Sequence, residues 1–531
     1  MQNIYKSAFL WSDESEGLGS KLFGYAISAD ALVIDCAGLS VYLKNHSPRE
    51  AVNSLRDGKF AMIGVDSEHV YLSSDFFGLE PIYYWSDESA WVASNSVFVL
   101  LKELRRRSQK LVLRRSAIAA FQLSGAFGTQ LMSCSTWVEG VKILPVKCYL
   151  QIDRVTKIAR LLPHCKPTES RATREQYHSA IQTFISSAQA RMLAVSKATT
   201  GQRFVDLSGG QDSRLVYGLA ASTPQLNRIF FARSNPNMSK DFEVASKVSS
   251  HFSIKLGSPH REDSRIDGVT AFELWKIHNA GVYRPVYPPL TQSPRNLLQF
   301  NGASPIATGY VKLSANERLK SWRAGLAPEI YDLVHREFRK GLSDVGLKIG
   351  DDGSIDAHYA NFRSRLHYGR ASYTHLVWFN DSPLMSSQFA ELADLALRLG
   401  VRKNQLMCDL LVSLHPTLAQ EKFASDESNF SNGEIAEATS SLPRLEHRSI
   451  KDLTIYGEIF RASVINAQPK RTFQEVFREE FMRNSVKGNS LFSPRYLKAA
   501  ADQIQNTEDA RDWGNASVLL SYSKYLEVIR G

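Results

Sequence analysis

Short apolar segments separated by polar turns fill the first third of the chain, from residue 19 to residue 153. Several of them alternate apolar and polar positions with the two-residue period of a half-buried strand. The apolar segments are KLFGYAIS, ALVID, KFAMIGV, HVYLSS, PIYYW, AWVAS and CYLQI. Turns at 57–58 and 66–68 fall at hairpin spacing. The pattern therefore predicts antiparallel sheet, interrupted by one helix over 114–124.

The periodicity changes after a polar break at 163–172. The segment EQYHSAIQTFISSAQARMLAV has apolar residues at helical spacing. It is followed by strand RFVDL, helix DSRLVYGLAA, strand RIFFAR and helix DFEVASKVSSHF, with Ser239 as the expected N-cap and Asp241 in the first turn. Strict alternation of strand and helix predicts parallel strands joined by right-handed crossovers.

Helical patterns dominate beyond about residue 320, as in MSSQFAELADLALRLGV and the final SVLLSYSKYLEVIR. The chain has 531 residues, and a single core stops growing at roughly 250–300 residues, so at least two cores are expected. We place one domain at 1–165 and a second at 170–531. The predicted fold is therefore α+β followed by α/β: an antiparallel sheet region, then a parallel sheet with a helical C-terminal part.

Charge and cysteine content narrow the class of protein. The 64 Lys and Arg exceed the 54 Asp and Glu, which gives a net charge of +10, but outside 104–116 the basic residues are dispersed. A solvated basic face is favoured over a nucleic-acid site, because no aromatic or Gly-rich nucleic-acid motif accompanies that cluster. No apolar run approaches the ~18 residues that a membrane span needs. The five cysteines lie scattered, without metal-ligand spacing: Cys36, Cys134, Cys148, Cys165 and Cys408. We expect a cytoplasmic protein with reduced thiols and with neither nucleic acid nor membrane as a partner.

Residues 204–214, FVDLSGGQDSR, carry the clearest chemical signal. A buried strand leads into a Ser/Gly loop and then into an apolar helix, which is the arrangement that binds phosphate: glycines admit the anion, and the helix N-terminus adds N–H donors and positive potential. Ser208 and Ser213 add hydroxyl groups, and Asp212 is a candidate Mg²⁺ ligand. The loop is not a Walker A loop, because it lacks the final Gly-Lys-Ser/Thr.

At these residues the chain resembles the asparagine synthetase superfamily, whose ATP-pyrophosphatase domain carries an SGGxDS loop and adenylates a carboxylate. Residues 57–61 (DGKFA), 74–84 (SDFFGLEPIYY) and 93–94 are similar to the class II glutamine amidotransferase domain of that family. The resemblance implies that the first domain is an Ntn-hydrolase-like antiparallel β sandwich with flanking helices. It implies a second domain with a Rossmann-like parallel sheet, as in the adenine nucleotide α-hydrolases, and ATP and Mg²⁺ as cofactors.

Three departures affect the amidotransferase half. Residue 2 is Gln, where the family has a Cys nucleophile that uses its own α-amino group as base. The family's Asn-Gly-Glu glutamine-binding loop is missing, and Ser74 replaces an expected Arg. We therefore expect the first domain to keep its fold without glutaminase activity.

That loss is shared with relatives of the β-lactam synthetase and lasso peptide macrolactam cyclase type, in which an amine displaces AMP from the adenylated acid. Thr308-Gly309-Tyr310 is similar to the Ser-Gly-Tyr of β-lactam synthetase. The resemblance implies that Tyr310 acts as a general base or relay. A packing role for this tyrosine is an equally weighted alternative. Lys470 lies where the superfamily has a charge-stabilising lysine, although Arg471 could fill the role.

Further assignments complete the predicted site. Glu317 could replace the missing acid of the pyrophosphate loop as a Mg²⁺ ligand, or be an ordinary helix-start residue. A basic cluster over 363–370 could hold a substrate carboxylate or pyrophosphate, with ion pairing to nearby helices somewhat favoured. The predicted nucleotide-binding residues are Ser208, Gly209, Gly210, Asp212, Ser213, Ala232 and Gly309; the catalytic residues are Tyr310 and Lys470; the Mg²⁺ ligands are Asp212 and Glu317.

The function predicted is an ATP-dependent amide-forming ligase without glutaminase activity, with a macrolactam or other natural-product cyclase favoured by resemblance alone. The alternatives are an asparagine synthetase fed by free ammonia and a non-catalytic nucleotide-binding scaffold. If the substrate is a ribosomal precursor peptide, a leader protease and a leader-binding protein are the expected partners.

Overall fold

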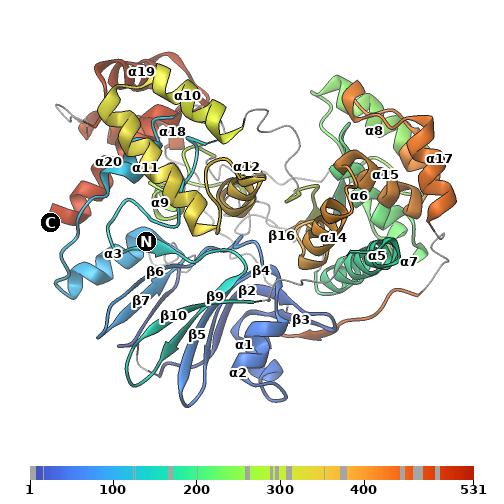
Figure 1. Cartoon of the computed structure of the whole chain (residues 1–531), viewed down its shortest axis with the longest axis horizontal. Coiled ribbons are helices and arrows are strands. Elements are labelled where there is room, and N and C mark those ends of the chain that lie inside the picture. The colour runs from blue at the N-terminus through green and yellow to red at the C-terminus, as the bar shows by residue number, and fades with distance from the viewer. Residues whose placement is uncertain are drawn as a thin grey trace.

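The computed structural model describes most of the chain. The described residues are 8–15, 17–123, 125, 127–164, 172–199, 201–257, 264–287, 291–292, 298–305, 314–351, 353–370, 379–442, 449–458, 471–484 and 491–530. The described part is a mixed α/β structure with 49% helix and several sheets, one of which is wholly parallel. Figure 1 shows the N-terminal sheets along one side, with the parallel-sheet region and a mainly helical region above them.

Two sheets pack face to face in the N-terminal part. A seven-stranded sheet has the order β10-β9-β5-β4-β2-β3-β17, and a four-stranded sheet has the order β1-β7-β6-β8. Their strands are β1 (Leu10–Ser12), β2 (Lys21–Ile27), β3 (Ala31–Ile34), β4 (Asp57–Val65), β5 (His69–Ser74), β6 (Tyr83–Ser86), β7 (Trp91–Ser94), β8 (Lys142–Ile143), β9 (Cys148–Asp153), β10 (Ala159–Pro163) and β17 (Thr454–Tyr456).

Alternation along β4 explains how the large sheet buries both faces. Ala61 and Ile63 join Trp91 of the smaller sheet in one apolar cluster, whereas Phe60 and Met62 join the cluster under α1 (Asp35–Tyr42) and α2 (Pro48–Ser54). Successive side chains of a strand point to opposite faces, so one strand serves two cores. The predicted antiparallel sandwich with flanking helices is present, with one parallel pair added by β17 and β3.

A third sheet, outside the N-terminal part, is wholly parallel and has the order β12-β11-β15-β16. Its strands are β11 (Arg203–Asp206), β12 (Phe231–Arg233), β15 (Leu298–Phe300) and β16 (Phe379–Asp381). The helices around it are α5 (Arg174–Lys197), α6 (Gln211–Ala221), α7 (Pro224–Asn227), α8 (Ser239–Ser250), α14 (Ser387–Arg398), α15 (Lys403–Leu414), α16 (Pro416–Gln420) and α17 (Asn432–Ser441). The predicted alternation of strand and helix with parallel pairing is confirmed between 174 and 250.

The remaining helices form two further apolar clusters with parts of the N-terminal half. They are α3 (Val97–Arg106), α4 (Arg115–Ala120), α9 (Gly268–His278), α10 (Ala315–Gly325), α11 (Pro328–Asp344), α12 (Ser354–His358), a π-helical turn (Tyr359–Ser364), α13 (Arg365–Arg370), α18 (Phe473–Arg483), α19 (Pro494–Asn506) and α20 (Gly514–Arg530). Short 3₁₀ turns lie at Asp426–Ser428 and Ala510–Asp512. Strands β13 (Ser264–Arg265) and β14 (Thr291–Gln292) form a two-stranded antiparallel sheet. No helix of the described residues is long and apolar enough to span a membrane.

Local predictions were wrong at several places. Helices α1, α2 and α3 also interrupt the region 19–153, where one helix was expected. The expected turn at 57–58 lies inside β4, where Gly58 pairs with Ala26 of β2, so the chain continues in extended form. Helix α8 begins at Ser239 with Met238 at the N-cap, and no side chain caps it, although Asp241 does lie in the first turn. The turn at 66–68 is confirmed, because the Asp66 carboxylate accepts the N–H groups of Glu68 and His69 at 2.9 and 2.7 Å.

An ion pair with both side chains buried joins the parallel sheet to its first helix. Arg191 of α5 donates from Nε and Nη2 to the two carboxylate oxygens of Asp381 at 2.8 and 2.5 Å, and Asp381 is fully shielded from solvent. Burial opposes ionisation of Asp381, but Arg191 outweighs it and lowers the pKa of that carboxyl group. A charge of this kind is tolerated inside a protein only while its partner is present.

Replacing the arginine tests this dependence. We expect Arg191→Met to lower the free energy of unfolding by about 3–5 kcal/mol, because it strands the Asp381 carboxylate in an apolar interior. Lys197, at the end of the same helix, forms an exposed ion pair with Asp452, and Lys197→Met should cost less than about 1 kcal/mol. Chemical denaturation followed by tryptophan fluorescence measures both, and equal losses would contradict this account of the pair.

Candidate functional site

The SGGxDS segment forms the turn between β11 and α6. The Ser208 N–H donates to Ser213 Oγ at 3.0 Å, and the two serine hydroxyls lie 2.8 Å apart. Gly210 occupies the N-cap of α6 and provides no capping side chain. The first turn of a helix leaves its N–H groups without helical acceptors, so this end of α6 is suited to an anion.

Two glycines allow the loop to lie this close to its neighbours. A Cβ atom on Gly209 would stand 2.2 Å from Cβ of Ala424 and 2.5 Å from Oδ1 of Asp241. A Cβ atom on Gly302 would stand 2.6 Å from the backbone N of Ser213. Gly302 lies just past the carboxyl end of β15, so the neighbouring strand end is packed directly against the first turn of α6.

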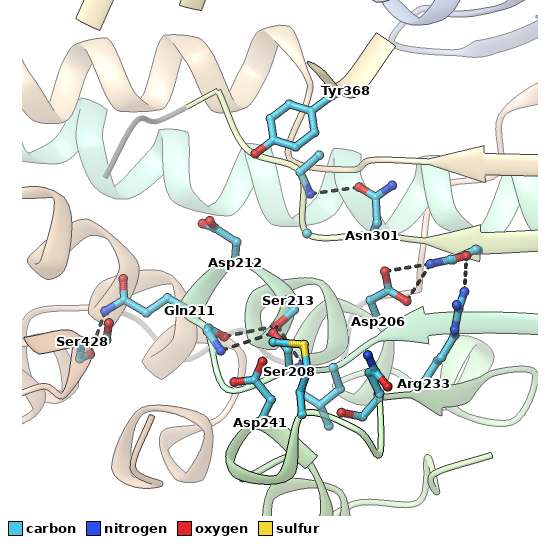
Figure 2. Close-up of a pocket in the computed structure, with 18 of the residues that line it drawn as sticks. Asp206, Ser208, Gln211, Asp212, Ser213, Arg233, Asp241, Asn301, Tyr368 and Ser428 are labelled. Atoms are coloured by element: carbon cyan, nitrogen blue, oxygen red, sulfur yellow. Dashed lines mark hydrogen bonds between the residues drawn. The ribbon is translucent and has the colours of Figure 1, made fainter. Parts of the chain in front are cut away.

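A cleft of about 690 Å³ opens at the carboxyl ends of β11, β12 and β15. Open parallel sheets bind ligands at this edge. Figure 2 shows the Asp212 carboxylate directed into the open space beneath the Tyr368 ring, with Ser208 and Asp241 on the opposite side. The polar residues that line the cleft are Asp206, Ser208, Gln211, Asp212, Ser213, Arg233, Ser234, Asn235, Asp241, Gln299, Asn301, Tyr368, Lys403 and Ser428.

Asp212 has an unsatisfied acceptor in this cleft. Its Oδ1 atom is shielded from solvent and has no hydrogen-bond partner. Burial raises the pKa of this carboxyl group, and the Lys403 ammonium partly opposes the rise. A buried carboxylate oxygen without a partner is costly, so it fits a role in holding a cation.

The neighbouring carboxylate is differently placed. Asp206 accepts from Gln299 Nε2 at 2.8 Å with both oxygens, and Gln299 Oε1 in turn accepts from Arg233 Nη1 at 2.6 Å. Burial raises the pKa of Asp206 to about 6. These hydrogen bonds fix the strands β11, β12 and β15 relative to one another.

Ser234 provides a second polar atom for a ligand in the cleft. Its Oγ atom is shielded from solvent and has no hydrogen-bond partner.

Mg²⁺ fits these groups only with further oxygen ligands. Among the residues that the structure describes, no group of three or more His, Cys, Asp and Glu side chains is arranged to hold a metal ion. Mg²⁺ is commonly bound by one or two carboxylates together with phosphate oxygens and water. Asp212 is therefore the candidate protein ligand in a site that a phosphate would complete.

Most of the predicted nucleotide-binding residues lie together. Ser208, Gly210, Asp212 and Ser213 line the cleft. Gly209 packs closely against Ala424 and Asp241. Ala232 is fully buried in β12, one residue before the lining residues 233–235. The predicted residues Gly309, Tyr310 and Lys470 lie outside the described residues.

Glu317 does not lie in this cleft. Its carboxylate accepts from the Ser314 N–H at 2.7 Å and from Ser314 Oγ at 2.8 Å, closing a capping box at the start of α10. These bonds lower the pKa of Glu317. Figure 1 places α10 in the helical region, away from α6. The structure therefore does not bring Glu317 to Asp212, and the helix-start role fits its contacts.

The other basic candidates are also directed elsewhere. Arg365 donates to the carbonyl oxygens of Gly78 and Leu144 at 3.3 and 2.8 Å, and Arg363 donates to the Thr129 hydroxyl. Arg471 forms an ion pair with Glu479. Tyr368, from the same stretch as Arg363 and Arg365, lines the cleft.

Several lining residues were missed by reasoning from the sequence. Gln299 and Asn301 belong to the short strand β15 and its exit, in the sequence LQFNG, where two polar residues at a strand end are the available signal. Lys403 and Tyr368 come from helices far along the chain, and no local pattern marks them. A scan of protein-family models finds no match to this chain, and a search of curated proteins finds none either.

The close contact at Gly302 gives a test of the geometry. We expect Gly302→Ala to lower the free energy of unfolding by roughly 1–3 kcal/mol, because backbone atoms of α6 must move. Gly325→Ala is the control, since an added Cβ there meets nothing within 4 Å. Thermal denaturation compares the two, and a neutral Gly302→Ala would show that the strand end and α6 are not in contact.

Proposed function

We propose that this chain is an ATP-dependent ligase that adenylates a substrate carboxylate and passes the acyl group to an amine, without glutaminase activity. The observation that carries the proposal is the unpartnered Asp212 Oδ1 beside the Ser208–Ser213 turn, in a cleft at the carboxyl ends of parallel strands. The resemblance of this turn to the SGGxDS loop supports a nucleoside triphosphate as the anion.

Each described group has a part in the first step. The hydroxyls of Ser208 and Ser213 and the first-turn N–H groups of α6 would hold phosphate oxygens. Asp212 would hold Mg²⁺, which supplies neutralisation of the phosphate charge as pyrophosphate leaves. Lys403 lies close enough to Asp212 that each charge shifts the pKa of the other group, so Lys403 adds a positive charge near Asp212.

The reaction balances without a redox partner. A substrate carboxylate oxygen bonds to the α-phosphorus of ATP while the bond to pyrophosphate breaks. The amine nitrogen then bonds to the acyl carbon, AMP leaves, and the amine proton passes to a base. By resemblance we propose Tyr310 as that base or relay, Gly309 as a nucleotide contact and Lys470 as the charge-stabilising cation.

For the substrate we propose a natural-product acid, with a peptide that closes into a macrolactam favoured by the resemblance. A ribosomal precursor peptide would bring a leader protease and a leader-binding protein as partners, and we propose the cytoplasm as the place of reaction. This part of the proposal depends on the resemblance alone.

Pyrophosphate exchange tests the adenylation step. Exchange of labelled pyrophosphate into ATP is expected with one acid from a panel of amino acids, diacids and short encoded peptides. Asp212→Asn should reduce it by about 100-fold or more, because the Mg²⁺ ligand is lost. Asp394→Asn, which removes an exposed carboxylate on α14, should leave it unchanged. Full exchange by Asp212→Asn would overturn the assignment of the loop.

Glutamine hydrolysis tests the other half of the proposal. Neither the native chain nor Gln2→Cys should release glutamate from glutamine, because the glutamine-binding loop is absent as well as the nucleophile. An enzyme-coupled glutamate assay gives the measurement. Glutamate release that depends on the new cysteine would contradict the account of this domain.

A further inference from the structure

A buried polar contact joins the seven-stranded sheet to the parallel sheet. The hydroxyl of Tyr25, on β2, donates to Oδ1 of Asp381 at 2.5 Å, on the carboxylate that Arg191 also binds. The centroid of the Tyr25 ring lies 4.8 Å from that of Phe379, which is two residues before Asp381 on β16. Tyr25 is 3% exposed and Asp381 is 0% exposed, so water does not compete for these bonds.

The same residue of β16 is bonded to the rim of the cleft. The Asp381 carbonyl accepts the Asn301 N–H at 3.0 Å. Ser382 Oγ donates to Asn301 Oδ1 at 2.7 Å, and that oxygen also accepts the Ala303 N–H at 2.9 Å. These bonds hold the turn 301–303, whose Gly302 packs on the backbone of Asp212 and Ser213.

Other polar side chains of the N-terminal sheet point across the same junction. Asp57 accepts from the Ser387 N–H at 2.7 Å and from its hydroxyl at 3.2 Å, at the start of α14. Lys59 is the cross-strand partner of Tyr25 and is 3% exposed, with Asp381 among the charges that act on it. A surface that only filled space would be apolar, because buried polar groups are costly unless they are paired.

We propose that Tyr25 is a positioning residue for the nucleotide cleft. By holding Asp381, it fixes the turn 301–303 against the first turn of α6, so the N-terminal half shapes the cleft. The inference rests on the proposed function only for its nucleotide readout.

Hydrogen exchange of the protein without nucleotide tests the positioning directly. The amides of Asn301 and Ala303 are the reporters, because both are bonded within this network. Tyr25→Phe should speed their exchange about fivefold, the effect of losing one hydrogen bond worth about 1 kcal/mol. Tyr71→Phe is the matched control: it removes a tyrosine–carboxylate bond, to Asp66, from β5 of the same sheet. Ser382→Ala should reproduce the faster exchange from the cleft side without touching β2.

Steady-state kinetics supply the second readout. Tyr25→Phe should raise the KM for ATP about fivefold with kcat little changed, whereas a general loss of folded protein would lower the apparent kcat alone. Tyr71→Phe should match the native chain. Identical exchange at 301–303 in the two tyrosine variants would overturn the positioning role. Native protein that binds no ATP would instead overturn the proposed function, and the exchange comparison would still decide the role of Tyr25.

Discussion

The ion pair between Arg191 and Asp381 is the constraint on which the rest of the structure depends. Both groups are buried, and each would be strongly unfavourable alone. The pair fixes α5 against β16. The Tyr25 hydroxyl donates to the same carboxylate and so attaches the N-terminal sheet to β16. Asp381 is the last residue of β16. The contacts of α5 and of the N-terminal sheet with Asp381 therefore lie at the carboxyl edge of the parallel sheet, where the cleft opens.

The chemistry of the cleft follows from the carboxyl ends of three short strands, β11, β12 and β15. Parallel strands bring their carboxyl ends to one edge, so Asp206, Arg233 and Gln299 meet there and bind one another. Asp212 lies in the first turn of α6, and its Oδ1 atom has no hydrogen-bond partner. The contrast between two neighbouring aspartates, one satisfied and one not, distinguishes a residue that supports the site from one available to a ligand.

Local sequence was enough to predict the elements whose signal is continuous in the chain. The alternation around β4 and β5 and the helical period of α5 gave the right structure, and the string SGGQDS lies in the strand–turn–helix context expected of it. The prediction for Glu317 leaves two roles open; the Ser314–Glu317 spacing of a capping box, a local signal that this prediction does not use, favours the helix-start role. At 57–58 a turn dipeptide proved to be strand, because pairing with β2 outweighs local propensity.

Contacts between distant segments could not be predicted in this way. Tyr25 and Asp381 are separated by 356 positions, and β15 and β16 are three-residue strands with little apolar pattern. Strand β17 joins the N-terminal sheet beside β3 from near residue 455, which no periodicity in either segment indicates. Lys403 and Tyr368 enter the cleft for the same reason: the fold places them there, and their own neighbours in sequence do not.

The central claim is that the cleft binds a metal–ATP complex through the turn before α6. The most direct measurement is a crystal structure with α,β-methylene-ATP and Mn²⁺, with the metal located by anomalous scattering. The account predicts an anomalous peak within bonding distance of the Asp212 carboxylate and phosphate oxygens on the 208–213 turn. A nucleotide bound elsewhere, or a metal away from Asp212, would contradict it.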